Sequence, residues 1–126
     1  MKLDQARPLT SAEEAILRSL LSPDFPGAKE LRAQIQEVRV IASCDCGCPT
    51  IDLDVPTSVA RASVPTTRNR TPYEGDVRGP EGESIADIMV FINDGRLSSL
   101  EYVTHQEPAP RTWPEVADVA LVGPLA

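Results

Sequence analysis

The beginning of the chain carries apolar residues at helical spacing. Within residues 9–22 four aliphatic side chains fall on one stripe, and Thr10 stands three residues before Glu13, as in a capping box. Pro23 prevents this helix from continuing. After an Asp-Phe-Pro-Gly turn, a second and shorter helix is predicted over residues 28–35. The stripe of the first helix consists of Ile16, Leu17, Leu20 and Leu21.

After these helices the period of the apolar positions changes to two. Residues 38–42 and 51–55 alternate between apolar and polar side chains, which predicts two half-buried strands. Gly47, midway between them, permits a turn with positive φ, so the two strands are expected to form a hairpin. Cys44 and Cys48 would then flank the tip of this hairpin.

Residues 85–103 predict a second hairpin at the centre of the sheet. Its first strand is apolar on both faces except for Asp87, and the Asn-Asp-Gly sequence at 93–95 is a strong hairpin signal. A two-residue turn, the register that we favour, places Tyr102 opposite Asp87 as its hydrogen-bond partner. A three-residue turn would instead place Glu101 opposite Asp87.

Two proline-rich segments complete the chain. Residues 56–84 have the composition of a long Pro/Gly-rich loop, within which 59–64 is expected to add a short edge strand. Residues 104–126 form a Pro-rich tail, in which 114–122 predicts a short terminal turn or helix. We therefore expect a single domain, 1–126, of the α+β class, with two N-terminal helices packed on an antiparallel sheet of about four strands.

The charge balance excludes some classes of partner. The net charge is −7, from 12 basic and 19 acidic residues, so the chain repels phosphate backbones and anionic lipids. Neither nucleic acid nor a membrane is an expected partner. The N-terminal sequence lacks the apolar run of a signal peptide, and three cysteines cannot all pair within the chain. These features indicate a reducing compartment and a cytoplasmic protein.

The three cysteines at 44, 46 and 48 are the main candidate site. Thiolates are soft ligands that bind zinc or copper(I), and a bent turn would bring Cys44, Cys46 and Cys48 around one ion. A closed zinc site needs a fourth ligand, for which His105 and Asp45 are the candidates. The predicted metal ligands are therefore the three cysteines with His105, and zinc is the one cofactor considered.

Two other roles for the cysteines remain open. In the first, Cys44 and Cys48 serve only as small hydrophobic residues near the sheet edge, with Cys46 as a turn residue. In a thiol-dependent redox enzyme, Cys46 would instead be the nucleophile, and Cys44 or Cys48 would resolve the disulfide. The spacing differs from the C-x-x-C of thioredoxin-like proteins, and the sequence contains no G-x-S-x-G, H-E-x-x-H or phosphate-binding glycine motif. No catalytic residue is predicted.

Three motifs carry a resemblance to known proteins. The sequences LLSPDFPGAKELRAQ at 20–34, CDCGCPTIDL at 44–53 and DGRLSSLEYV at 94–103 resemble a group of small uncharacterised actinobacterial proteins. Those proteins have a helical pair, a CxCGC-type hairpin and a later DGxLSxLE hairpin. The resemblance implies a small α+β fold and carries no activity.

The function that we favour from the sequence is association with another protein. The strand at 85–92 is apolar on both faces, so its second face needs cover from the loop, the tail or another subunit. We expect a non-enzymatic protein with an unidentified protein partner, and a second copy of the chain, in a homodimer, is one candidate. The alternative is a zinc- or copper-binding protein that uses the cysteine hairpin, and a thiol-dependent redox enzyme is the weaker alternative.

Overall fold

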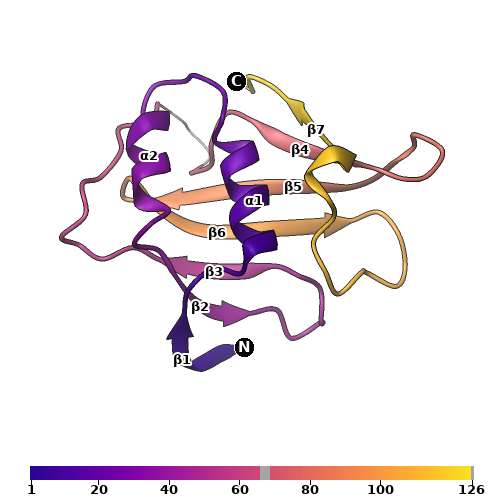
Figure 1. The fold of residues 1–126 in the computed structure, drawn as a ribbon, viewed down its shortest axis with the longest axis horizontal. Coiled ribbons are helices and arrows are strands. Elements are labelled where there is room, and N and C mark those ends of the chain that lie inside the picture. The colour runs from indigo at the N-terminus through magenta and orange to yellow at the C-terminus, as the bar shows by residue number, and fades with distance from the viewer. Residues whose placement is uncertain (66–68, 126) are drawn as a thin grey trace.

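A seven-stranded antiparallel sheet forms most of the protein. The computed structural model describes residues 1–65 and 69–125, and within them the strands follow the order β1-β2-β3-β6-β5-β4-β7 (Figure 1). The elements are β1 (Lys2–Arg7), α1 (Ser11–Leu20), α2 (Ala28–Gln34), β2 (Arg39–Ser43), β3 (Ile51–Asp54), β4 (Glu74–Arg78), β5 (Ser84–Asn93), β6 (Arg96–Thr104), the 3₁₀ turn η1 (Val116–Asp118) and β7 (Val119–Val122).

The predicted fold class, an α+β domain with two helices on about four strands, is wrong. Strand β1 precedes the first helix, β4 lies inside the segment predicted as a loop, and β7 lies in the tail. The expected edge strand at 59–64 does not form. The missed strands are short, and β1 and β4 carry few apolar residues whereas all four residues of β7 are apolar, so their backbone pairing identifies them and their side-chain pattern does not.

Helix α1 begins at the predicted capping box. The Thr10 hydroxyl accepts a hydrogen bond from the Glu13 amide at 3.2 Å, and the Glu13 carboxylate accepts one from the Thr10 amide at 2.8 Å. Arg7 adds two bonds to the same carboxylate, at 2.9 and 3.0 Å. Burial would raise the pKa of Glu13, but the bonds from Arg7 and Thr10 and the charge of Arg7 outweigh it, so this pKa is lowered.

The two helices lie over one face of the sheet, and the core fills the space between them (Figure 1). The predicted α1 stripe is fully buried, and alternate residues of β5 point toward it. No helix in residues 1–65 or 69–125 has the length and apolar character to cross a membrane. The central core residues are Ile16, Leu17, Leu20, Leu21, Leu31, Ala86, Ile88, Val90, Ile92 and Leu100.

The central hairpin turns at Asp94 and Gly95, but a bulge changes its register. Ile92 pairs with Leu97, as the two-residue turn predicts, and the register then shifts between Phe91 and Ile92. Asp87 therefore lies opposite Val103, and neither Tyr102 nor Glu101 occupies that position. This extra residue could not be predicted from the sequence, because Ser98 and Ser99 fit either face of the strand.

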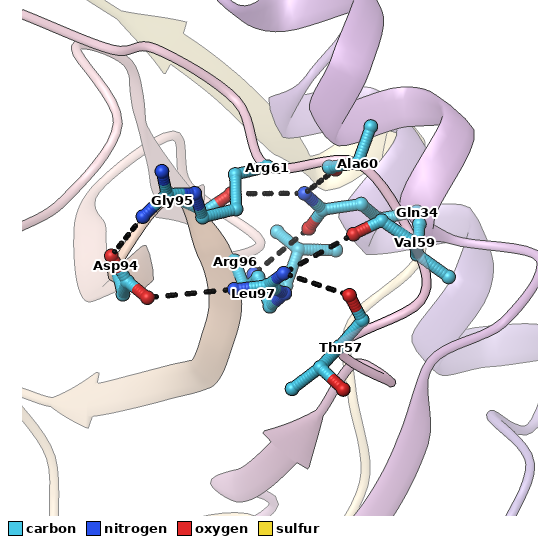
Figure 2. Close-up of polar contacts among 9 residues, drawn as sticks. All are labelled: Gln34, Thr57, Val59, Ala60, Arg61, Asp94, Gly95, Arg96 and Leu97. Atoms are coloured by element: carbon cyan, nitrogen blue, oxygen red, sulfur yellow. Dashed lines mark hydrogen bonds and ion pairs between the residues drawn. The ribbon is translucent and has the colours of Figure 1, made fainter.

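One buried glutamine connects helix α2 to this hairpin (Figure 2). Gln34 is fully buried, and its Nε2 donates to the carbonyl oxygens of Ala60 at 3.1 Å and Gly95 at 2.9 Å. Its Oε1 accepts a hydrogen bond from the Leu97 amide at 3.0 Å. A Cβ atom at Gly95 would lie 2.4 Å from the carbonyl oxygen of Ala62, so only glycine permits this close approach. The glutamine thereby fixes the helix, the turn and the 56–64 segment together.

Charged side chains support the same turn from outside. Asp94 contacts Arg61 at 2.8 Å and Arg96 at 3.5 Å. Nη2 of Arg96 also donates to the carbonyl oxygens of Thr57 at 3.2 Å and Val59 at 3.3 Å (Figure 2). The loop after β3 thus lies against the β5–β6 turn through backbone acceptors.

Replacing Gln34 by Leu tests how much this network contributes. The variant leaves the Leu97 amide and two carbonyl groups without a partner in a buried site, so the free energy of unfolding should fall by about 2–4 kcal/mol. Urea denaturation followed by circular dichroism measures the change. Gln36→Leu is the matched control, since Gln36 is exposed and its replacement should change stability by less than about 0.5 kcal/mol. Equal losses in the two variants would contradict the role of the network.

Candidate metal centre

The loop from residue 44 to residue 50 connects β2 to β3 and carries all three cysteines. The predicted hairpin is confirmed, because β2 and β3 pair antiparallel with Val40 opposite Leu53. Two backbone bonds close the loop, from the Cys44 amide to the Thr50 carbonyl at 3.2 Å and from the Gly47 amide to the Cys44 carbonyl at 3.3 Å. Gly47 has φ of 88°, a conformation that favours glycine. The loop therefore has a defined turn at the position predicted from the sequence.

This turn brings the three sulfur atoms together. All three Sγ atoms lie within 4.8 Å of one another, and no disulfide joins them. The Sγ atoms of Cys44 and Cys46 are 2.7 Å apart, and the Cys48 amide donates to the Cys46 sulfur at 3.3 Å. Thiolates bound to one zinc ion at about 2.3 Å lie about 3.8 Å apart in a tetrahedral shell. All three sulfur atoms are thus within reach of one ion, and the Cys44 and Cys46 sulfurs would move apart to coordinate it.

The pKa values of Cys48 and Cys46 are shifted in opposite directions. Burial raises the pKa of Cys48, but hydrogen bonds from Cys46, from Thr50 and from Cys44 outweigh burial and lower its pKa to about 7. Hydrogen bonds to Cys44 and Cys48 raise the pKa of Cys46 to about 11. Cys48 therefore ionises before Cys46. The redox hypothesis gave the nucleophilic role to Cys46, whose proton is the harder one to remove.

The other two predicted ligands lie outside the cluster. Nε2 of His105 is 3.2 Å from the carboxylate of Asp87, and His105 follows β6 at the far end from the β5–β6 turn. Asp45 lies within the loop, but its side chain is exposed and contacts the amino group of Met1 at 3.1 Å. Among the described residues, the group that can hold a metal consists of the three cysteines alone.

An arginine from the tail lies beside the loop. Cys48 lines a cleft of about 330 Å³ together with Arg111 and Trp113. The guanidinium of Arg111 is so close to the loop that a Cβ atom at Gly47 would lie 3.0 Å from its Nη1. Sequence analysis missed Arg111 because it is 63 positions after Cys48, in a segment with no regular pattern. The cleft thus holds a positive charge together with Cys48.

Comparison with known proteins gives no information on a metal centre at the three cysteines. No family model, no curated protein and no solved structure is significantly similar to the chain. The resemblance to actinobacterial proteins with CxCGC-type and DGxLSxLE hairpins stays a prediction. The chemistry of the described residues therefore carries the functional argument.

The acidity of Cys48 gives a direct prediction for alkylation. The thiolate is the reactive form, so labelling of Cys48 by iodoacetamide should rise through pH 7 and level off near pH 8, whereas Cys46 should need a pH near 11. Tandem mass spectrometry of the peptide that holds all three cysteines distinguishes the sites. Cys46→Ala removes the strongest of the hydrogen bonds that lower the pKa, so the Cys48 midpoint should move upward. A common pH profile for Cys46 and Cys48 would refute this order.

Proposed function

We propose that the chain binds a thiophilic metal ion, zinc or copper(I), through Cys44, Cys46 and Cys48. The observation that carries the proposal is the convergence of three Sγ atoms within 4.8 Å on a loop closed by its own backbone bonds. Soft thiolate ligands select zinc and copper(I) over calcium, magnesium or manganese. This role is one of binding, and it requires no catalytic residue.

Metal binding at this site is coupled to loss of protons. Cys48 has a pKa of about 7 and is therefore partly ionised near neutral pH, so it is the natural first ligand. Cys44 and Cys46 lose their protons as the ion binds, because the thiolate is the coordinating form. Affinity should consequently increase with pH over the range in which the thiols ionise.

The number of ligands indicates how the ion is held. Three protein thiolates leave the fourth position of tetrahedral zinc open to water or to an external ligand. Cys46 is exposed, and the loop lies at one end of the sheet, apart from the helix-covered core. We infer that the ion is exchangeable and that the fold does not need it. Three free thiols also favour a reducing compartment, and we place the protein in the cytoplasm on that ground.

Metal titration of single variants tests this proposal. The thiol-reduced protein should bind one equivalent of zinc or copper(I) in competition with a chromophoric chelator. Each of Cys44→Ser, Cys46→Ser and Cys48→Ser should weaken binding at least tenfold, because each removes one of three ligands. His105→Ala is the matched control and should leave the affinity unchanged, since His105 contacts Asp87.

Thermal unfolding of the metal-free protein tests whether the cysteines serve only to bind the ion or also stabilise the fold. Cys46→Ser should keep the Tm within a few degrees of the parent, because Cys46 is exposed and contributes nothing to the core. If the parent binds no metal, or if His105→Ala weakens binding as strongly as the cysteine variants, the proposed centre is wrong.

The second candidate function is association through the uncovered face of the sheet. Both helices lie on the opposite face (Figure 1). On the outer face Met89 and Phe91 of β5 are half-buried, and Val103 of β6 is exposed. Glu101 lies opposite Met89 and Asp52 lies opposite Ser99, so carboxylates flank the apolar residues. An apolar strip with carboxylates beside it favours a protein partner.

The charge of this face indicates which partner fits. Asp52 has no ion pair within the described residues, and Glu101 contacts only the Ser99 hydroxyl, at 3.1 Å. Two copies of this face would bring like charges together, on a chain whose net charge is −7. We therefore favour a basic, partly apolar protein surface over a homodimer through this face.

An amphipathic peptide of alternating leucine and lysine tests this surface. Methionine methyl NMR is a convenient measurement, because the chain has two methionines and Met89 lies on the outer face. The Met89 signal should shift on titration, and the affinity should fall severalfold in Asp52→Asn/Glu101→Gln. Glu30→Gln/Glu37→Gln removes two exposed charges elsewhere and should not change it. A shift that is equal for a leucine–glutamate peptide, or a Met89 signal that never moves, would reject the surface.

A further inference from the structure

A second cavity lies at the end of the sheet, under the C-terminal tail. It has a volume of about 530 Å³ and is bounded by the β4–β5 turn, by the end of β6 and by the tail between residues 106 and 118. Figure 1 shows this tail crossing the ends of β5 and β6 before it reaches β7. Cavities of about 300–1,000 Å³ with mostly apolar walls are typical of small-molecule sites. The apolar wall residues are Val77, Ile85, Pro108, Ala109, Trp113 and Pro114.

Tyr102 provides a polar group in this apolar wall. Its side chain is only 6% exposed and lines the cavity. Within the described residues its hydroxyl makes no hydrogen bond, and the oxygen is not fully enclosed. A polar group without a protein partner in a mostly apolar wall is a feature of ligand sites.

The aromatic rings give the cavity a rigid wall. Trp113 packs against Tyr102 edge to face, with the ring centroids 6.0 Å apart and an interplanar angle of 77°. Burial raises the pKa of Tyr102, so the phenol is neutral at physiological pH and can donate a hydrogen bond. The apolar residues and the Trp113 ring that line the cavity suit the ring of a ligand, and Tyr102 supplies a hydroxyl group in the same wall.

The charges near the cavity disfavour an anionic ligand, because the exposed carboxylate of Asp118 also lines it. Arg78 is at the edge, but its Nε contacts the Asp76 carboxylate at 2.8 Å and its Nη1 donates to the Gly82 carbonyl at 3.0 Å. Its positive charge is thus balanced by the protein itself. We propose that the cavity binds a neutral, apolar ring compound that carries one hydrogen-bond acceptor, such as a carbonyl oxygen, directed at Tyr102.

This site is separate from the metal centre. Trp113 lines both this cavity and the cleft that holds Cys48, so the indole forms a wall between them. None of the three cysteines lines the larger cavity. Binding of the ring compound consequently needs no metal and no ionised thiol.

A matched pair of probes tests the proposal on the intact chain. Trp113 is the single tryptophan, so its indole N–H gives one NMR signal at the wall of the cavity. The probes are 1-indanone, a neutral bicyclic ketone, and indane, which lacks the carbonyl oxygen. Both should shift the indole signal, with 1-indanone binding about fivefold to tenfold more tightly because only it accepts the hydrogen bond from Tyr102. Probes of this size, with about ten and about nine heavy atoms, should saturate at about millimolar concentration.

Two variants separate the hydrogen bond from the cavity itself. Tyr102→Phe keeps the ring and removes the hydroxyl, so it should make the two probes bind equally while the affinity for indane stays the same. Ala109→Phe places a ring in the cavity and should abolish both shifts. The proposal is wrong if neither probe moves the Trp113 signal, if Ala109→Phe binds like the parent, or if 1-indanone keeps its advantage in folded Tyr102→Phe protein.

Discussion

The pairing of β5 with β6 is the constraint on which the rest of the structure depends. Gln34 holds the turn of this hairpin against helix α2, and the bulge after the turn decides which residues face the helices. With this register Ile88 lies opposite Tyr102 in the core, and Met89 lies opposite Glu101 on the outer face. A shift by one residue would exchange these two faces. The core, the acidic outer face and the position of Tyr102 therefore have one common cause.

The cysteine loop depends on the same hairpin through β3. Ile51 pairs with Leu100, and the Thr50 hydroxyl accepts a hydrogen bond from the Tyr102 amide at 2.9 Å. Thr50 also closes the loop through its carbonyl bond to Cys44. One residue thus connects the last turn of the cysteine loop to the central strand. The sulfur atoms are held by a loop with both ends fixed in the sheet, which limits the entropy lost when an ion binds.

The sequence predicts those parts of the structure that local patterns specify. The capping box of Thr10 and Glu13, the α1 stripe and the turn at Gly47 follow from spacing and from residue type. The edge strands β1 and β7 do not, because a strand of four to six residues without alternating apolar and polar side chains becomes recognisable only through its hydrogen-bonded neighbour. The number of strands was wrong for this reason, and the α+β class was wrong with it.

The same dependence on local patterns explains which ligands of the candidate metal centre could be predicted from the sequence. Cys44, Cys46 and Cys48 are close in sequence, so a turn is enough to bring them together. His105 was a plausible ligand only by residue type, since no local pattern fixes its distance from residue 48; the hairpin register places it beside Asp87 instead.

The C-terminal tail shows what long-range pairing adds to a sheet of this kind. β7 pairs with β4, so residues 105–118 must cross from the end of β6 to the opposite edge of β4. On this path Trp113 packs on Tyr102, and Arg111 reaches the loop that holds Gly47. The tail supplies few residues to the core, yet it supplies walls to both the cysteine cleft and the apolar cavity. A segment without regular structure is well suited to forming such walls, because its side chains need not alternate between two faces as those of a strand do. The sheet provides the rigid support, and the tail determines the shape of the surfaces that can bind.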